Sequence, residues 1–399
     1  MSAHSWITTT ITADYVHGAV ELEPTERGLM PHRLTAGARQ QVNGPVEPKV
    51  FSDPSGVRLR LRTRAQHLRL TTWPVKVHIP ARPPGPIPVY DIWCDGRLHA
   101  QLEAAGGTLI IQDRATGRQL RREDAEPAEI AVPALPEGEK LVEIWLPYEE
   151  WTELIAFHTE QPVEPAPYPH SAVRWVHHGS SISHGAVTVG ASHAWPAVAA
   201  REITAQRPLD LMNLGFAGNA KLDQFTARTI SRTPADVISL KLGINVVNGD
   251  SHSLRSFTPA VHGFLDTIRD RHAQTPVLVV SPLWCGIHEH TPGPVESFDV
   301  EGPDGIRSAF RAAGRPDDVD RDRLTLQLVR AELERIVALR AADDPNLHFL
   351  SGLRLYGEQD SAEYPLPDDL HPDTDTHRLI GLRFAEEVLR AGILPPAAT

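Results

Sequence analysis

A segment near the C-terminus, Asp-Asp-Leu-His-Pro, holds a carboxylate and an imidazole at a spacing suited to acid–base chemistry. Asp368 stands three residues before His371. At this spacing the carboxylate can reach back to the imidazole Nδ1–H, which fixes the tautomer and leaves Nε2 facing a nucleophile. The pair therefore predicts catalysis on a hydroxyl group, provided that the fold brings a serine to His371.

The candidate nucleophile lies in the stretch Gly179-Ser180-Ser181-Ile182-Ser183. This run of small residues leads from a predicted strand towards a helix, where free backbone N–H groups favour an alkoxide or a developing oxyanion. An ordinary Ser/Gly-rich loop explains the same stretch when it is taken alone. Two other residues follow predicted strands: Gly218, where an N–H can approach a ligand, and Asn245, whose NH₂ can face an oxyanion. A plain turn and a turn-capping asparagine are the alternative interpretations.

Strands and helices alternate in the C-terminal half and can position these residues. Repeated strand–helix units predict a parallel sheet with helices on both faces, and the site of such a sheet lies outside the carboxyl ends of its strands. Helical periodicity marks Trp195–Ile203, Val261–Ile268, Val329–Val337 and Leu379–Leu389. The predicted strands are 173–177, 209–213, 237–242, 277–280 and 347–350.

The N-terminal half is strand-like and predicts a β-sandwich. Strand candidates are 57–62, 109–111 and 142–146. The arginines that alternate with apolar residues in 57–62 are interpreted as the solvent face of a strand, with an anion site as the alternative. A proline-rich linker at 162–170 divides the chain into an N-terminal domain, 1–161, and a C-terminal domain, 171–399.

Composition excludes several classes of function. The 399 residues have a formal net charge of −12 and no basic stripe, so we expect no nucleic-acid partner. Two cysteines exclude a disulfide framework and a thiolate zinc site. No signal peptide or membrane-spanning run is evident, so a cytoplasmic location is expected. No glycine loop with a lysine suggests ATP or NAD as a cofactor.

Two further features of the C-terminal half have competing interpretations. His288-Glu289-His290 is a conceivable metal site, but its spacing differs from that of HExxH, so we favour a loop without metal. Trp284 can line a pocket or fill a core, and the core is favoured.

The ordered blocks resemble those of the SGNH hydrolases, the GDSL esterase/lipase family, over roughly residues 172–392. The resemblance implies that Ser181 is the nucleophile and that Asp368 and His371 complete a triad. It also implies an oxyanion hole formed by Ser181, Gly218 and Asn245. Ser180 replaces the aspartate of the family, and Ser180 and Ser183 remain weaker rivals as nucleophiles.

The resemblance further implies a flavodoxin-like, three-layer α/β domain preceded by a jelly-roll sandwich like a carbohydrate-binding module. Some two-domain members are carbohydrate esterases. Others are acyltransferases that decorate polyketides, such as salicylyl transferases. The expected function is a serine esterase without cofactor or metal, using an ester or thioester donor and water. An acyltransferase with an alcohol acceptor and a non-catalytic binding protein are the alternatives. The oligomeric state stays open.

Overall fold

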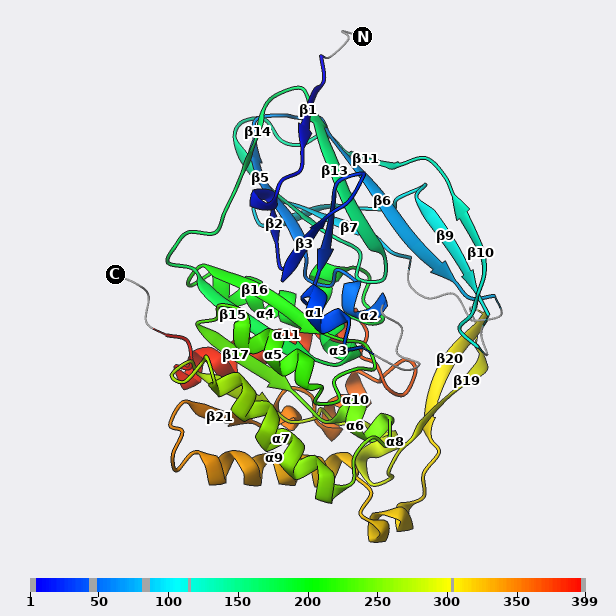
Figure 1. The fold of residues 1–399 in the computed structure, drawn as a ribbon, viewed down its shortest axis with the longest axis vertical. Helices are drawn as coiled ribbons and strands as arrows, with labels where there is room; N and C mark the ends of the chain where they lie inside the picture. Colours follow the sequence, from blue (N-terminus) through cyan, green and yellow to red (C-terminus); the bar gives the residue numbers. More distant parts are fainter. Residues whose placement is uncertain (1–4, 43–48, 81–86, 114–115, 303–304, 396–399) are drawn as a thin grey trace. The chain divides into compact units, whose positions relative to one another are not determined.

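The computed structural model describes residues 5–42, 49–80, 87–113, 116–302 and 305–395 (Figure 1). The chain divides into two compact units. Its main division falls directly after Pro169, at the end of the proline-rich segment. Unit 1 comprises Met1–Ala36, Glu47–Pro169 and Val189–Ser192, and unit 2 comprises Gly37–Val46, His170–Thr188 and His193–Thr399.

Unit 1 is built from two β-sheets whose strands pair antiparallel, except for the parallel pair β6–β9. The apolar core between the sheets includes Leu59 and Ile144 from one sheet and Leu70 and Phe157 from the other. The first sheet contains β1 (Ile7–Thr10), β3 (Glu21–Pro24), β4 (Leu29–His32), β6 (Leu68–His78), β9 (Thr108–Gln112), β10 (Gln119–Asp124), β11 (Ala128–Val132) and β13 (Trp151–Thr159). The second contains β2 (Val16–His17), β5 (Arg58–Thr63), β7 (Tyr90–Cys94), β8 (Arg97–Leu102), β12 (Lys140–Trp145) and β14 (Val163–Pro165).

The arginines of β5 are not a solvent face, so that prediction is wrong for two of them. Arg58 is 1% exposed and Arg60 is 8% exposed, while Arg62 is exposed. The reason is that the segment predicted as a linker covers them: β14 pairs with β5, and the Tyr168 ring lies 3.6 Å from the Arg60 guanidinium. Arg60 also pairs with Glu143 at 2.8 Å. Alternation along one strand shows which residues share a face, but not what covers that face.

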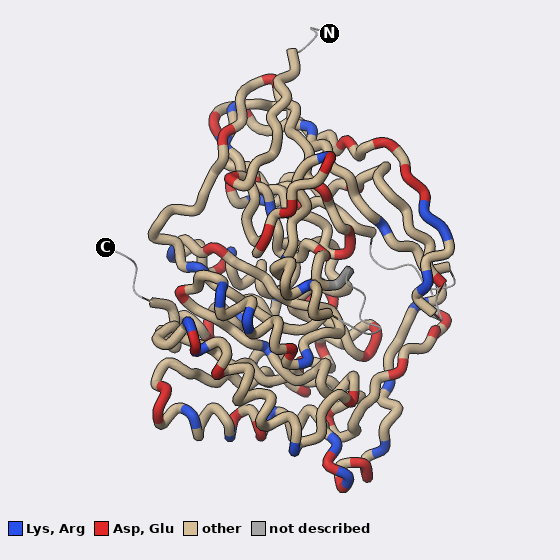
Figure 2. The backbone as a smooth tube through the Cα atoms, viewed as in Figure 1, with Lys and Arg blue, Asp and Glu red and all other residues tan. Residues whose placement is uncertain are grey.

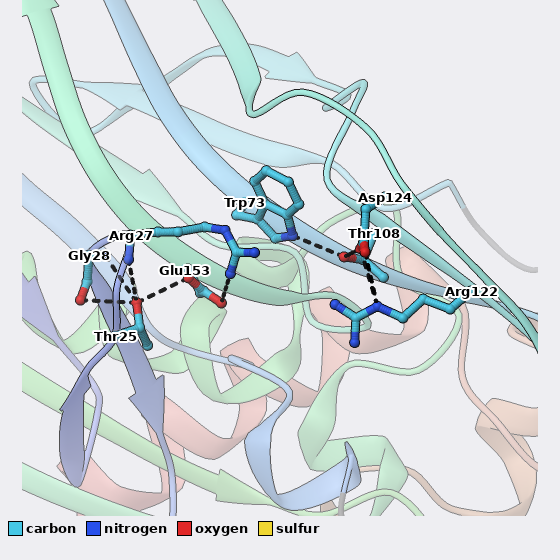
Figure 3. A network of polar contacts seen from close by, with 8 residues as sticks. All are labelled: Thr25, Arg27, Gly28, Trp73, Thr108, Arg122, Asp124 and Glu153. Carbon is cyan, nitrogen blue, oxygen red and sulfur yellow. Dashed lines mark hydrogen bonds and ion pairs between the residues drawn. The ribbon is translucent and has the colours of Figure 1, made fainter.

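A network of polar contacts connects the β3–β4 turn of unit 1 with strands β6, β9, β10 and β13 of the same sheet (Figure 3). The Arg27 guanidinium lies 4.1 Å above the Trp73 ring and pairs with Glu153 at 3.3 Å. The Trp73 indole N–H donates to Thr108 Oγ1 at 3.0 Å, and the Thr108 hydroxyl donates to Asp124. These contacts join strands that are distant in sequence, and they fix the polar atoms around a largely buried tryptophan.

Unit 2 has a five-stranded parallel sheet in the order β16-β15-β17-β18-β21, which is the flavodoxin-like order 2-1-3-4-5. The predicted α/β fold class is confirmed. Helices α4 and α11 lie on one face, where Trp195 and Phe384 pack on Trp175. Helix α7 covers the other face through Phe264. The strands are β15 (Val173–Gly179), β16 (Leu209–Gly215), β17 (Val237–Lys241), β18 (Val277–Val280) and β21 (Leu347–Leu350), and the long helices are α4 (Trp195–Thr204), α5 (Gln224–Arg232), α7 (Leu254–Arg269), α9 (Leu326–Arg340) and α11 (Thr374–Ala391).

Several elements lie outside the predicted set. Helix α5 and the two-stranded hairpin of β19 (Val295–Gly302) and β20 (Gly305–Ala312) were not expected.

Acidic and basic side chains are interspersed along the described parts of both units, for example along α9 (Figure 2). Among the described residues, no helix is long and apolar enough to cross a membrane.

Two buried histidines, His177 on β15 and His377 on α11, should make the stability of unit 2 depend on pH. His177 and His178 of β15 point to opposite faces, where they meet Trp195 and Phe264 respectively. Burial holds the pKa of His177 well below its usual range and lowers the pKa of His377 on α11 to about 3. The folded protein therefore keeps these rings neutral at a pH where the unfolded chain protonates them.

We expect the free energy of unfolding to fall as the pH drops below about 6.5, the usual histidine pKa. Each such histidine binds a proton only on unfolding, so its contribution is complete above that pH and is lost towards pH 3, by roughly 1.4 kcal/mol per pH unit. Urea unfolding at pH 7, 6 and 5 measures this loss. In the His377→Gln variant, the slope of the unfolding free energy against pH should be smaller, by the amount that corresponds to about one fewer proton bound on unfolding. Equal stabilities at pH 7 and pH 5 in the unmodified protein would contradict the expectation.

Candidate active site

Three strand ends of unit 2 meet at one edge of the sheet. In the parallel ladder, Gly179 at the end of β15 pairs with Gly215 at the end of β16. The Phe216 N–H donates to the Gly179 carbonyl at 2.8 Å, which locks the two following loops together. Strand β17 runs beside β15 and ends at Lys241, just before the turn that carries Asn245. The serine stretch, the Gly218 loop and the Asn245 turn therefore start from the same edge.

Ser181 begins α3 (Ser181–His184), a one-turn helix directly after β15. Its Oγ lies 2.9 Å from His371 Nε2, although 190 positions separate the two residues in the chain. Ser180 is the N-cap, and its hydroxyl accepts the Ile182 N–H at 3.4 Å. A serine can thus cap this helix where the resembling family has an aspartate.

Asp368 holds His371 from the side opposite the serine. His371 Nδ1 lies 2.7 Å from Asp368 Oδ2, and Asp368 Oδ1 accepts the backbone N–H groups of Leu370 and His371 at 3.0 and 2.6 Å. Burial alone would raise the pKa of this carboxyl, but the hydrogen bonds from His371 and the two backbone N–H groups hold it below its usual range. An ionised Asp368 fixes Nδ1 as the protonated nitrogen, so Nε2 can accept a proton from Ser181.

The unexpected hairpin supports the histidine loop. The Phe310 N–H of β20 donates to the Asp368 carbonyl at 3.0 Å, and the Phe310 ring meets the His371 ring edge-on at a centroid distance of 5.4 Å. Arg307, also on β20, donates to the Pro367 carbonyl. The signal that could have revealed the hairpin is the turn-forming sequence Gly-Pro-Asp-Gly between two runs rich in strand-forming residues.

The two rival serines are unsuited to nucleophilic attack. Both Ser180 and Ser183 are fully buried, whereas Ser181 is 8% exposed. Ser183 Oγ lies 2.8 Å from His177 Nε2, and His177 Nδ1 lies 2.7 Å from Ser239 Oγ. Within the described part of the chain, this second serine–histidine pair has no carboxylate partner, and it fixes the end of β15. Gly179 permits the close approach, because a Cβ there would lie 2.3 Å from Ser183 Oγ.

The predicted oxyanion donors have their hydrogens available. Asn245 is buried, and its Oδ1 accepts the Ala220 N–H at 3.0 Å, which assigns the amide orientation. Among the described residues, nothing accepts a hydrogen bond from Asn245 Nδ2, from the Gly218 N–H or from the Ser181 N–H. Gly218 has a φ of +70°, which favours glycine. Ser181, Gly218 and Asn245 therefore follow three strands that end at one edge of the sheet and offer unused donors.

Replacing Asn245 by alanine should lower turnover by about 10²–10³-fold, the usual effect of losing one oxyanion donor. The substrate KM should change much less, because the donor acts most strongly on charge that develops in the transition state. Steady-state kinetics on an activated ester measures both constants. Asn248→Ala, at the end of the same short helix α6 (Ile244–Asn248), is the matched control. Turnover within twofold of the unmodified enzyme would remove Asn245 from this role.

A pocket in unit 2 adjoins the serine and histidine. Three of the residues that line the pocket are chain neighbours of the serine or the histidine. Ile182 follows Ser181, and Leu370 and Pro372 flank His371. Trp284 also lines it and is half-buried, so the favoured assignment of this tryptophan to the core is wrong. Trp284 comes four residues after the end of β18 (Val277–Val280), beyond the sheet, and it contributes to the wall of this pocket.

The His288–His290 segment does not gather metal ligands. It overlaps α8 (Gly286–Glu289), a one-turn helix where we expected a loop, and Glu289 is paired with the Arg330 guanidinium of α9. His288 Nδ1 lies 3.0 Å from the Thr291 carbonyl oxygen. Within the described ranges, no group of three or more His, Cys, Asp or Glu side chains could hold a metal ion.

Comparison with known proteins adds a family and a set of similar folds. Residues 178–379 match the model of the GDSL-like lipase/acylhydrolase family. A search of curated proteins finds no match. Among solved structures, the salicylyl-acyltransferase SsfX3 from a tetracycline biosynthetic pathway is 27% identical, with a TM-score of 0.76 and 98% of each chain covered.

Two other structures share the fold at lower identity. A putative GDSL-like lipase from Bacteroides ovatus is 16% identical, with a TM-score of 0.67, and the match covers 99% of this chain and 100% of that one. A family two carbohydrate esterase from Clostridium thermocellum is 14% identical, with a TM-score of 0.55, over 86% of this chain and 97% of that one. These likenesses extend through both units.

Proposed function

Because the chain belongs to the GDSL-like lipase/acylhydrolase family, whose members are esterases and acyltransferases, we propose that it cleaves an ester or thioester through an acyl-enzyme on Ser181. The observation that carries this proposal is the unbroken chain of contacts from Ser181 Oγ to His371 Nε2, at 2.9 Å, and from His371 Nδ1 to Asp368 Oδ2, at 2.7 Å. The alternative of a non-catalytic binding protein gives no reason for this arrangement.

In the first half-reaction, Ser181 Oγ attacks the carbonyl carbon of the donor while His371 Nε2 takes the serine proton. The carbonyl oxygen becomes an oxyanion that the Ser181 and Gly218 N–H groups and Asn245 Nδ2 stabilise. When the tetrahedral intermediate collapses, the bond to the leaving alcohol or thiol breaks, and His371 returns the proton to that group. Asp368 stays ionised and stabilises the imidazolium throughout.

In the second half-reaction, water or an alcohol attacks the acyl-serine with His371 again as the base. Water gives an esterase, which is our first proposal. An alcohol gives an acyltransferase, which is supported by the similarity to SsfX3 over nearly the whole of both chains. Both outcomes use the same residues, and the acceptor that reaches the acyl-serine fastest decides between them.

Fluorophosphonate labelling followed by intact-mass measurement tests the proposal. We expect one adduct on the unmodified protein and none on Ser181→Ala, with Ser183→Ala labelled like the unmodified protein. A folded protein that takes no adduct would contradict both enzyme proposals. Once labelling is established, product analysis with a donor ester in the presence and absence of an added alcohol separates hydrolysis from transfer.

A further inference from the structure

The proposed base and its carboxylate partner lie on one loop of unit 2. Residues 364–373 connect α10 (Glu358–Glu363) with α11 and form neither helix nor strand, and they include Asp368 and His371. A loop has no ladder of backbone hydrogen bonds to hold it, so its position depends on contacts with neighbouring segments. The 2.9 Å between His371 Nε2 and Ser181 Oγ therefore depends on what fixes this loop.

Donors from other segments hold three successive carbonyl groups of this loop. The Phe310 N–H of β20 donates to the Asp368 carbonyl at 3.0 Å, and the Arg307 guanidinium of the same strand donates to the preceding carbonyl. Cys285 Sγ lies 3.4 Å from the carbonyl oxygen that follows. A thiol is a weak donor, so the two contacts from β20 are the stronger ones. The hairpin therefore fixes the backbone of the loop.

Phe310 also contacts the side chain of the proposed base. Its ring meets the His371 ring edge-on, with 5.4 Å between the centroids and 74° between the planes. Side chains alternate along β20, so Phe310 lies on the opposite face of the strand from Ala309. Ala309 is 1% exposed and Phe310 is half-buried, so burial of the alanine fixes the direction in which the phenylalanine points. The hairpin therefore holds the ring against the imidazole.

The imidazole loses one of its contacts during the proposed reaction. In the acyl-enzyme, Ser181 Oγ carries the acyl group and has no hydrogen to donate to His371 Nε2. Of the contacts described above, those with the Asp368 carboxylate at Nδ1 and with the Phe310 ring remain. The hydrogen bond fixes one atom of the imidazole, and the packed ring limits how the other atoms move. The aromatic contact thus matters most when water or an alcohol must be activated.

We propose that Phe310 is a positioning residue that keeps His371 Nε2 directed at the reacting oxygen in both half-reactions. This inference rests on the proposed function and adds a residue to it. The backbone of β20 holds the loop and the Phe310 ring holds the imidazole, so one strand fixes both parts of the base. Phe310 takes no part in proton transfer, and its loss should slow both half-reactions without weakening substrate binding.

Phe310→Ala should lower the kcat for para-nitrophenyl acetate by about tenfold to a hundredfold, as expected when a base is misplaced by up to about 1 Å. KM should stay within about threefold, because His371 is the base of both half-reactions and both slow together. The rate constant for fluorophosphonate labelling of Ser181 should fall by a similar factor. Phe310→Tyr keeps the ring and should restore both rates to within about threefold. A folded Phe310→Ala variant with unchanged kcat and labelling rate would overturn the proposal.

Phe298→Ala is the matched control. Phe298 lies on β19 of the same hairpin and is half-buried like Phe310, but its ring lies 5.0 Å from the Arg311 guanidinium. We expect this variant to keep kcat and the labelling rate within about twofold. Equal losses in Phe298→Ala and Phe310→Ala would mean that any damage to the hairpin has the same effect, and they would overturn the specific role of Phe310.

Labelling of the unmodified protein separates this proposal from the function on which it rests. If fluorophosphonate does not modify Ser181 there, the proposed function fails. If it does, and Phe310→Ala is labelled and turns over at the same rate, the positioning role alone fails. Phe310→Leu keeps the apolar bulk without the flat ring and provides a second variant if the alanine variant does not fold. Its labelling rate should fall by about tenfold, and an unchanged rate would contradict the role of Phe310.

Discussion

Ser181→Ala is expected to lower kcat by about 10⁶-fold, to the level that substrate binding and the oxyanion donors sustain alone. The alanine removes the atom that lies 2.9 Å from His371 Nε2, so no acyl-enzyme can form. Steady-state hydrolysis of an activated ester measures the loss, and quenched-flow analysis should show no burst of released alcohol. The substrate should still bind, because the pocket walls are unchanged.

Ser180→Ala is the matched control for this substitution. It removes a neighbouring hydroxyl whose contact is the helix cap to the Ile182 N–H, so we expect activity within about tenfold and a loss of about 1 kcal/mol in stability. If Ser181→Ala kept more than a hundredth of the unmodified rate while Ser180→Ala lost more, the nucleophile would have to be reassigned.

Asp368→Asn is expected to lower kcat by about 10⁴-fold while leaving the fold intact. The carboxylate now accepts the His371 Nδ1–H and two backbone N–H groups. An asparagine can still accept the backbone hydrogens through Oδ1, but then its NH₂ faces His371 Nδ1. The imidazole would hold its proton on Nε2 instead, and it could no longer accept a proton from Ser181.

The neighbouring residue offers a control with the same change of charge. Asp369 is exposed, and its φ of +67° is a conformation that asparagine tolerates. Asp369→Asn should therefore keep activity within about threefold. The pH–rate profiles distinguish a catalytic effect from a structural one: the deficit of Asp368→Asn should shrink as the pH rises and hydroxide assists the reaction. Equal losses in the two variants would indicate damage to the loop rather than a role for Asp368.

Local sequence was sufficient to predict the framework of unit 2. The five predicted strands coincide with β15, β16, β17, β18 and β21 to within a few residues at their ends. The apolar periodicity of a strand or helix is encoded within the element itself. The carboxyl ends of parallel strands share one edge, so the order of the motifs was enough to expect Ser181, Asp368 and His371 together. The structure places these three within hydrogen-bonding distance, and their catalytic roles remain the prediction that the variants test.

Other features depended on segments that meet only after folding. Arg58 and Arg60 look solvent-facing within β5, and they are buried because Tyr168 and β14 cover them. Trp284 looks like a core residue and is a pocket wall. Burial is a property of the contacts between distant segments, so no pattern within one strand reports it.

The sequence by itself determined the chemistry that we propose for this protein, because the expected nucleophile follows a strand and the expected base and carboxylate precede the last helix, each as a residue type at a recognisable position. Only the tertiary structure decided what surrounds them. It put the Phe310 ring of the β19–β20 hairpin against His371 and made Trp284 part of the wall of the pocket beside them. The physical reason is that the protonation, orientation and selectivity of a group depend on the dielectric and the partners around it, and folding alone assembles these.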